Sequence, residues 1–164
     1  ISACLVGSEM CIRDSNVTAD LIPAQYILNM TGDTRYAIRH HPLPPSPDPP
    51  HVMVSRIIYN LTLPSNPVLK YGIGLDPAIW NLTDGVEFRV FLEVDGEIQM
   101  GVIDTLNPRE NVTDRGWIDY EINLSAYANK RVRIIFETLP GEKSNASYDW
   151  AFWGAPVILN SEET

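Results

Sequence analysis

Residues 86–96 read Val-Glu-Phe-Arg-Val-Phe-Leu-Glu-Val-Asp-Gly. Apolar side chains occupy every second position from 86 to 94, and successive side chains of an extended strand point to opposite faces. Asp95 and Gly96 follow at once, and both accept the positive φ that a two-residue hairpin turn requires. The stretch predicts a strand with one buried face, a tight turn and a return strand over residues 97–104.

The same period of two recurs on both sides of this hairpin. We predict further strands at residues 57–63, 69–75, 118–124, 132–136 and 148–159. No segment shows a sustained helical period apart from a short turn at 125–129. About eight short strands that are apolar on one face need a second sheet to cover that face. The prediction is an all-β protein, a β-sandwich, in which Asn60 and Asn123 point to solvent.

The length of 164 residues fits one domain. The stretch from Leu5 to Ser15 resembles the translation of a sequencing adapter, and we interpret residues 1–15 as a non-native artefact outside the fold. Residues 16–51 are predicted to form an irregular N-terminal segment of the same domain, with an extended proline-rich loop at 42–50. The β-sandwich follows over residues 52–160, and residues 161–164 form a tail. We expect the chain to be a fragment of a longer protein.

Composition excludes several classes of function. The formal net charge is −9, so the chain lacks the basic surface that nucleic acid or an anionic membrane would attract. No apolar run approaches the roughly 20 residues of a membrane-spanning helix, so we expect no membrane insertion by this segment. Cys4 and Cys11 both lie in or beside the adapter-like stretch, which leaves no cysteine for a disulfide or a thiolate zinc site.

Asn-x-Ser/Thr sequons are unusually frequent. About one would be expected by chance, whereas the chain has seven, at Asn16, Asn29, Asn60, Asn81, Asn111, Asn123 and Asn145. We predict an extracellular or cell-surface glycoprotein in which these asparagines are glycosylated. The alternative is that Asn and Thr are simply common on β-rich surfaces.

Several short motifs occur in the order of a known family. They are Leu-Lys-Tyr-Gly-Ile-Gly-Leu-Asp at 69–76, Gly-Val-Glu-Phe-Arg-Val-Phe at 85–91, Asp-Gly at 95–96, Ile-Asn-Leu-Ser-Ala-Tyr at 122–127, Val-Arg-Ile-Ile-Phe at 132–136 and Tyr-Asp-Trp-Ala at 148–151. Over residues 52–159 the chain resembles the galactose-binding-domain-like jelly rolls, nearest to the novel putative carbohydrate-binding module (NPCBM) type. The proline-rich loop and Phe-Trp-Gly at 152–154 depart from the family pattern.

The resemblance implies a jelly-roll β-sandwich of about eight antiparallel strands. It also implies a non-catalytic accessory domain, attached to a larger surface protein or carbohydrate-active enzyme. We therefore expect a module that binds carbohydrate or packs against neighbouring domains of a larger chain. Two alternatives stay open: a structural or adhesion domain of a glycosylated surface layer, and an extracellular accessory domain of a membrane glycosyltransferase.

Aromatic side chains are the candidates for sugar binding. Sugars stack their apolar ring faces on Trp or Tyr, while carboxylates accept hydrogen bonds from the hydroxyls. We expect Trp117 to be the best exposed of them, and a glycan on Asn123 would obstruct its face. The alternative for each tryptophan is core packing. The candidate carbohydrate-binding residues are Trp80, Trp117, Asp119, Tyr148, Asp149, Trp150 and Trp153.

A structural calcium ion is the one cofactor to consider, because jelly rolls of the resembled type often hold one. Hard oxygen ligands suit Ca²⁺, and Asp76, Asp84 and Asp149 lie near predicted strand ends, as do Asp104 and Asp114. The alternative is that they are solvated turn aspartates.

No catalytic constellation is predicted. Glu93 and Glu97 flank Asp95 in the spacing of a glucanase catalytic strand, but the hairpin turn places the two glutamates on different strands. His40 and His41 are adjacent, so in a strand they point to opposite faces and cannot easily share a metal. His51 could join one of them across the proline-rich loop, and the alternative is that all three are solvated loop histidines. We therefore expect no enzyme activity.

Overall fold

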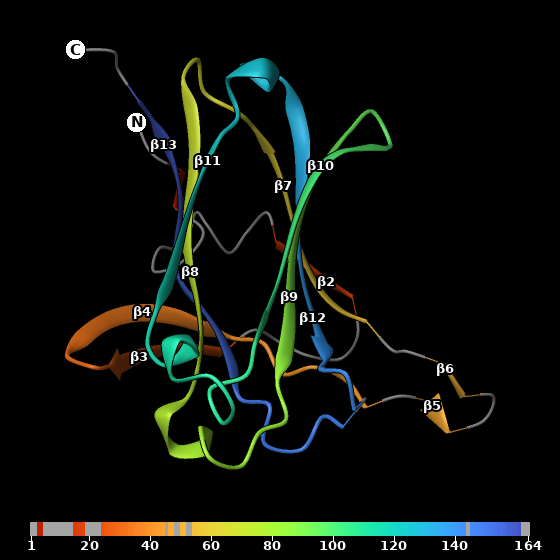
Figure 1. The fold of residues 1–164 in the computed structure, drawn as a ribbon. Helices are drawn as coiled ribbons and strands as arrows, with labels where there is room; N and C mark the ends of the chain where they lie inside the picture. The colour runs from red at the N-terminus through yellow and green to blue at the C-terminus, as the bar shows by residue number, and fades with distance from the viewer. Residues whose placement is uncertain are drawn as a thin grey trace.

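The computed structural model describes residues 3–4, 15–18, 24–44, 46–47, 50–51, 54–143 and 145–161. Two antiparallel sheets face each other and form a β-sandwich (Figure 1). One has six strands: β11 (Ile118–Asn123), β8 (Pro67–Leu75), β13 (Ala151–Asn160), β4 (Asp33–Arg39) and β3 (Ala24–Met30) in that order, with β1 (Ala3–Cys4) also paired to β13. The other has five, in the order β10 (Glu97–Leu106), β9 (Val86–Val94), β12 (Arg131–Pro140), β7 (Ser55–Thr62) and β2 (Ser15–Thr18).

Short elements connect these sheets. A two-stranded ribbon joins β5 (Ser46–Pro47) to β6 (Pro50–His51). Three single-turn 3₁₀ helices are η1 (Pro77–Ile79), η2 (Val112–Asp114) and η3 (Ser125–Tyr127). In the part of the chain that the structure describes, no helix is long and apolar enough to cross a membrane.

The predicted all-β jelly-roll sandwich is confirmed, and each of the seven strands expected from the alternation is present. In β9 every second residue is buried, from Val86 to Val94. Asp95 and Gly96 adopt φ of 52° and 80° in the hairpin turn. Asn123 is exposed and Asn60 is half-buried on the outer side of its sheet. The alternation therefore placed the core residues correctly, because burial of one strand face is what closes the two sheets.

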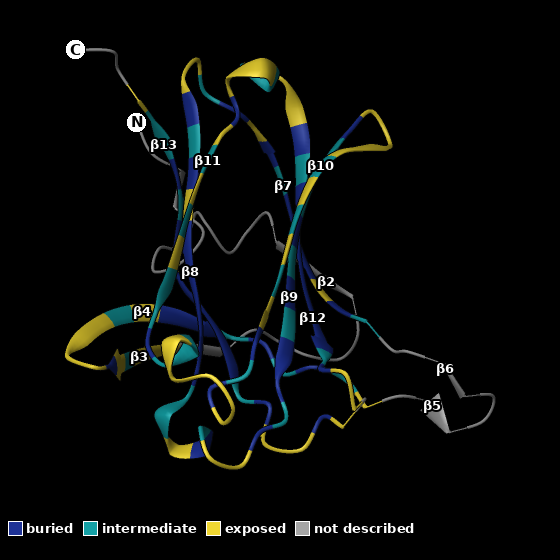
Figure 2. Ribbon diagram, in the orientation of Figure 1, coloured by how far each residue is buried: buried dark blue, intermediate teal, exposed yellow. Residues whose placement is uncertain are grey.

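Trp153 occupies the centre of the interface between the sheets. Its side chain is 1% exposed and makes edge-to-face contacts with Phe136, Phe88 and Tyr71, at centroid distances of 4.9, 5.2 and 5.7 Å. Such aromatic pairs add about 0.5–1.5 kcal/mol each beyond burial of their area. Figure 2 shows buried segments along both layers of the sandwich.

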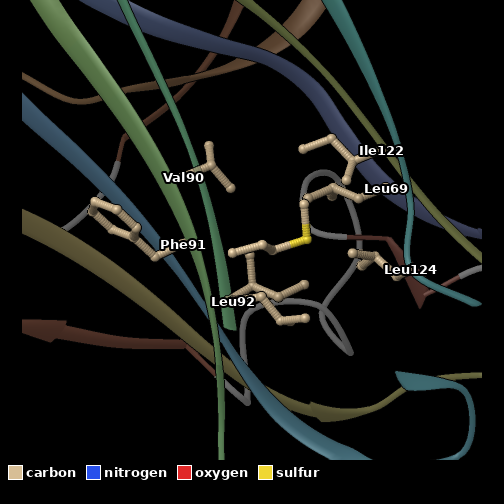
Figure 3. Close-up of a pocket in the computed structure, with 8 residues that line it drawn as sticks. Leu69, Val90, Phe91, Leu92, Ile122 and Leu124 are labelled. Carbon is tan, nitrogen blue, oxygen red and sulfur yellow. The ribbon is translucent and has the colours of Figure 1, made fainter. Parts of the chain in front are cut away.

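A small gap lies near the other end of the interior. It measures about 10 Å³ and is bordered by aliphatic residues, Phe91 and Met100 (Figure 3). That volume is roughly one water molecule, and an apolar lining offers a water no hydrogen bonds. Among the described residues, the side chains between the sheets therefore leave no room for a ligand at this gap.

Two regions before residue 52 differ from the sequence prediction. Residues 24–39 form a regular hairpin within the segment that was expected to be irregular, and Thr31 and Gly32 turn it with φ of 53° and 89°. Met30 and Ala37 are completely buried on its outer side, so both hairpin faces contain apolar residues and the period of two is blurred. The proline-rich loop itself includes the short β5–β6 pair.

The two chain ends also differ. Ala3 and Cys4 pair with Ile158 and Val157 of β13, so part of residues 1–15 does join a sheet, while residues 5–14 lie outside the described residues. The last strand begins at Ala151 and not at 148, because Tyr148 adopts a φ of 61° that an extended strand cannot contain. Asp149 and Trp150 consequently belong to a turn.

A buried histidine links the two sheets. His40 is 3% exposed; its Nδ1 accepts a hydrogen bond of 2.9 Å from the Trp153 indole N–H, and its Nε2 lies 2.8 Å from the Ser55 hydroxyl. Since Nδ1 accepts, the proton is on Nε2, which donates to Ser55. Burial lowers the pKa of His40 from 6.5 to about 3.

We predict that the His40 ring stays neutral as its Nε2–H tautomer from pH 8 to pH 4. Because its folded-state pKa lies below the unfolded value, neutral His40 stabilises the fold fully above pH 6.5, and that contribution falls by about 4 kcal/mol as the pH drops towards 3. ¹⁵N chemical shifts of the imidazole over this pH range test the assignment. A His40 titration midpoint near 6.5 would contradict it.

Candidate functional site

Three of the four tryptophans are unavailable as sugar platforms. Trp153 is in the core. Trp80 packs against the core, donates its indole N–H to the Leu75 carbonyl at 2.8 Å, and has the Arg115 guanidinium over its ring at 5.8 Å. Trp150 also packs against the core, and Arg39 lies over its ring at 5.6 Å. The Trp80 and Trp150 rings thus pack against the core and each have an arginine over them.

Trp117 fills a trench of glycines on the outer face of the six-stranded sheet. We call Gly72, Gly74 and Gly154 the glycine trench; Gly72 and Gly154 are direct cross-strand partners on β8 and β13. A Cβ built on Gly154 would lie 2.7 Å from Trp117 Cζ3, and one on Gly74 would lie 3.2 Å from Trp117 Cε3. Only glycine lets the indole approach the backbone this closely.

Arg35 covers the other side of the Trp117 ring, 5.3 Å from its centroid. Its guanidinium bonds both oxygens of Asp119 at 2.5 and 3.0 Å, and both oxygens of Asp33 at 3.1 and 2.7 Å. These carboxylates raise the pKa of Arg35, so its charge is permanent. The Trp117 N–H donates to the Asp33 carbonyl at 3.2 Å. Trp117, the predicted sugar platform, is therefore half-buried. Together with Arg35 it connects the start of β11 to β4.

An open depression lies beside Arg35 and Asp119. It has a volume of about 670 Å³, its charged walls include Arg35, Asp119, Lys70 and Glu121, and Gly154 and Ala155 contribute to its floor. Lys70 and Glu121 form an ion pair of 3.4 Å. No aromatic ring is free on its surface among the described residues, since the Tyr71 and Tyr120 rings stack on each other in the interior.

A second concavity crosses the outer face of the five-stranded sheet. Its centre is an apolar row that runs perpendicular to the strands, because its members are successive cross-strand partners: Gly101, Phe91, Ile135 and Ile58 on β10, β9, β12 and β7. The concavity has a volume of about 410 Å³. We call it the transverse trough. Figure 3 shows Phe91 pointing away from the interior side chains of β9.

Phe91 packs against the backbone of β10 with one edge of its ring. A Cβ built on Gly101 would be 2.6 Å from Phe91 Cδ1 and 2.7 Å from its Cε1, so the ring occupies the space that any other residue would need for its side chain. Phe91 is half-buried, and Gly101 is exposed beside it. The ring is therefore held in place by Gly101 and stays partly open to solvent.

Ion-paired side chains flank the apolar row on both sides. On one side Glu137, which is 4% exposed, accepts a hydrogen bond of 2.6 Å from Arg56 and lies 3.9 Å from Arg89. On the other side Arg133 donates to Glu93 at 2.9 Å. Arg89 additionally pairs with Glu87 at 2.8 Å. The guanidinium and carboxylate groups thus alternate. The charges of three arginines and three glutamates cancel: Arg56, Arg89 and Arg133 with Glu87, Glu93 and Glu137.

The sequence analysis missed this site, although it placed Phe91 on the outward face of its strand. The available signal was a single phenylalanine among Glu87, Arg89 and Glu93 at the outward positions of residues 86–94. A partly exposed aromatic between charged neighbours is unusual for a solvated strand face. Four of the seven sequence-predicted binding residues are tryptophans, and Phe91 is not among the seven.

Two buried carboxylates form a separate feature at the end of the sandwich that contains η1. Asp149 is completely buried, and its Oδ1 accepts a hydrogen bond of 2.8 Å from the Thr83 hydroxyl. Asp149 Oδ2 and both carboxylate oxygens of Asp84 are buried without a partner. Burial and the nearby Asp84 charge raise the pKa of Asp149 to about 7. Three unsatisfied carboxylate oxygens together with a hydroxyl fit the donor set of a hard cation.

The other predicted metal candidates have different roles. Asp76 caps η1 by accepting from the Ala78 N–H at 2.9 Å, Asp104 accepts from the Tyr120 hydroxyl, and Asp114 accepts from the Asn107 N–H at 2.8 Å. Among the described residues no three His, Cys, Asp or Glu side chains gather as a metal cluster. His40 is in the core, and the side chain of His51 lies outside the described residues.

The remaining predicted positions are at the surface. Tyr148 is 50% exposed and Asp119 is exposed. Five of the sequon asparagines are exposed (Asn29, Asn81, Asn111, Asn123 and Asn145), Asn60 is half-buried, and the side chain of Asn16 lies outside the described residues.

Comparison with known proteins finds a relative by sequence and several solved structures with a similar fold. No protein-family model matches the chain. An uncharacterized protein of Archaeoglobus fulgidus is 35% identical over 136 residues, which is 82% of this chain and 33% of that protein. This chain therefore spans about a third of the length of that relative.

Solved structures of carbohydrate-binding modules share the fold. The module TmCBM61 in complex with β-1,4-galactotriose has a TM-score of 0.55 at 13% identity and covers 92% of this chain and 90% of its own. The xylan-binding domain CBM22-1 of Paenibacillus barcinonensis Xyn10C has a TM-score of 0.54 at 10% identity over 100% and 95%. The CBM51-2 and INT domains of Clostridium perfringens ZmpB have a TM-score of 0.52 at 17% identity over 88% and 28%. At these identities the likeness establishes the β-sandwich fold.

We predict that Gly154→Ala destabilises the protein by about 1–3 kcal/mol, because the added methyl group collides with the Trp117 ring. In a Trp117→Ala background, Gly154→Ala should lower the free energy of unfolding much less. Denaturant unfolding of the wild type, both single variants and the double variant measures the coupling. An equal cost in both backgrounds would show that the trench does not confine the indole.

Proposed function

We propose that the chain is a non-catalytic carbohydrate-binding module and that the transverse trough holds the saccharide. The observation that supports this most directly is the partly exposed Phe91 ring, which packs against Gly101 on the outer face of the five-stranded sheet. Trp80, Trp117 and Trp150 have arginines over their rings and Trp153 is in the core, so the described part of the chain has no comparable indole platform. The β-sandwich fold shared with carbohydrate-binding modules is consistent with the proposal.

The trough offers both kinds of contact that a sugar needs. The apolar face of a pyranose stacks on Phe91, and water is released from both surfaces. Hydroxyl groups accept hydrogen bonds from Arg89 and Arg133 and donate to Glu93, whereas Ile135 and Glu137 are buried beneath them. Because the arginines and glutamates balance in charge, a neutral saccharide suits the trough better than an anionic one.

Binding without turnover fits the state of the carboxylates. Glycoside hydrolysis needs one carboxyl group that holds a proton and a second that attacks or activates water. Glu93 and Glu137 are instead engaged by Arg133 and Arg56. Both carboxylates therefore have a structural ion-pair partner within the sheet.

The proposed setting is the cell surface or the extracellular space, as an accessory part of a larger protein. The exposed sequons and the relative, which is about 2.5 times as long as this chain, support this setting. The partners we propose are a saccharide and neighbouring domains of the longer chain.

Phe91→Ala should weaken saccharide binding about tenfold or more, because it removes the stacking surface. Isothermal titration calorimetry with β-1,4-galactotriose, xylan and N-acetylglucosamine provides the measurement. Tyr148→Ala is the matched control, since it removes an exposed aromatic ring remote from the trough, and it should leave the affinity unchanged. Loss of binding in Tyr148→Ala but not in Phe91→Ala, or no binding of any probe by the wild type, would refute the proposal.

We also propose that Asp84 and Asp149 hold a structural Ca²⁺ ion. A bound cation would satisfy the three buried carboxylate oxygens that lack partners and would leave Asp149 ionised. Without it, ionised Asp149 destabilises the fold; because its folded-state pKa of about 7 exceeds the unfolded 3.8, the metal-free protein gains stability as the pH falls from 7 towards 4.

Added Ca²⁺ should raise the unfolding temperature at pH 7.5, and the increase should shrink below pH 7 as protons compete for Asp149. Asp149→Asn has nearly the same shape and should abolish the response while the metal-free protein stays folded. Differential scanning calorimetry with Ca²⁺ and with EDTA tests this. An unfolding temperature of the wild type that Ca²⁺ does not change would exclude the ion. If Ca²⁺ raised the unfolding temperature of Asp149→Asn as much as that of the wild type, the ion would bind at a different site.

A further inference from the structure

One sequon asparagine lies on the rim of the transverse trough. Asn60 is the cross-strand partner of Arg133, which in turn is the partner of Glu93. These three residues form the charged and polar row that borders the apolar row on one side. Asn60 is two residues from Ile58 on the same face of β7, a separation of about 7 Å. Its side chain therefore projects beside the sugar platform and not at a distant loop.

The position of Asn60 leaves it open to modification. The β2 strand pairs with β7 only from Arg56 to Tyr59, and the described residues place no strand beyond Asn60 on that side. Asn60 is half-exposed and Thr62, the third sequon residue, is exposed on the same face. No hydrogen bond to the Asn60 side chain is present among the described residues. The amide nitrogen is thus free to react.

We propose that Asn60 is N-glycosylated and that its glycan lies along the transverse trough and closes it to free saccharide. The inference rests on the proposed function, since the same stacking surface and hydrogen-bonding groups that would hold a free sugar would hold the attached one. The sequence predicts all seven sequons as acceptors. Asn60 is the one with a described side chain beside the trough; Asn16 pairs with Ile58 of the apolar row, and its side chain lies outside the described residues.

The modification step uses a lipid-linked oligosaccharide as the glycosyl donor. The Asn60 Nδ2 forms a bond to C1 of the first sugar, the bond from C1 to the lipid phosphate oxygen breaks, and one amide proton passes to a base. The lipid phosphate leaves with the electron pair. The product keeps one N–H on Asn60.

Tethering explains why the attached glycan would exclude a free ligand. A group held by a short flexible linker has an effective concentration in the millimolar range at a site that it can reach. The apolar row begins two residues from Asn60 and spans four adjacent strands, about 14 Å. A free saccharide must displace the attached one, so its apparent affinity falls by the factor that the effective concentration sets.

The test compares four forms of the protein made in a host with an oligosaccharyltransferase: wild type, Asn60→Gln, Thr62→Ala and Asn123→Gln. Thr62→Ala keeps Asn60 but destroys its sequon. Asn123→Gln is the matched control, because Asn123 is on the outer face of the opposite sheet. Peptide mass spectrometry measures occupancy, nuclear Overhauser effects between glycan and Phe91 ring protons measure contact, and calorimetry with β-1,4-galactotriose and xylan measures binding.

We expect Asn60 to be occupied in wild type, with glycan contacts to the Phe91 ring. Asn60→Gln and Thr62→Ala should bind a probe at least tenfold more tightly than wild type, while Asn123→Gln should bind like wild type. An unmodified Asn60, or an occupied Asn60 without contacts to Phe91, would overturn the inference. So would equal affinities in wild type and Thr62→Ala when both bind.

Failure of the proposed function gives a different result. If Thr62→Ala binds none of the probes, the trough does not bind those free saccharides. The Overhauser effects alone then decide whether the Asn60 glycan lies in the trough. Contacts between the glycan and the Phe91 ring would still support the placement of the glycan, and their absence would overturn it.

Discussion

The closing of two sheets over Trp153 is the interaction on which the rest of the molecule depends. Its indole makes ring contacts with β12, β9 and β8 and donates its N–H to buried His40. His40 bonds Ser55 on the opposite sheet, so the polar chain satisfies groups that burial would otherwise penalise. Because this interior is filled, ligand chemistry is confined to the outer faces and the ends of the sandwich.

The two outer faces are used differently. On the six-stranded sheet the Trp117 ring occupies the glycine trench under Arg35. Its aromatic surface is covered by the contacts that join β11 to β4. On the five-stranded sheet the corresponding space is kept by a single glycine, Gly101, and the edge of the Phe91 ring packs against it while the ring stays partly exposed. The same device, an aromatic ring on glycine, is therefore structural on one face and available for binding on the other.

The period of two predicted the strands after residue 52 and their buried faces, because alternation follows from the geometry of an extended chain. It did not predict which outward aromatic rings are free. Arg35 and Asp119 meet across a separation of 84 residues, and no local pattern reveals that such a contact covers Trp117. The partner of Phe91 was equally hidden: a bulge between Ile98 and Met100 shifts the register and puts Gly101 opposite the ring.

Chemical-shift mapping by nuclear magnetic resonance tests the central claim most directly. With β-1,4-galactotriose or xylan added to unglycosylated protein, the largest changes should occur at Phe91, Gly101 and their neighbours on β9, β10 and β12. The Trp117 indole and the residues around the glycine trench should stay unchanged. Changes centred on Trp117 and Asp119, or none above those of the buffer control, would contradict the account.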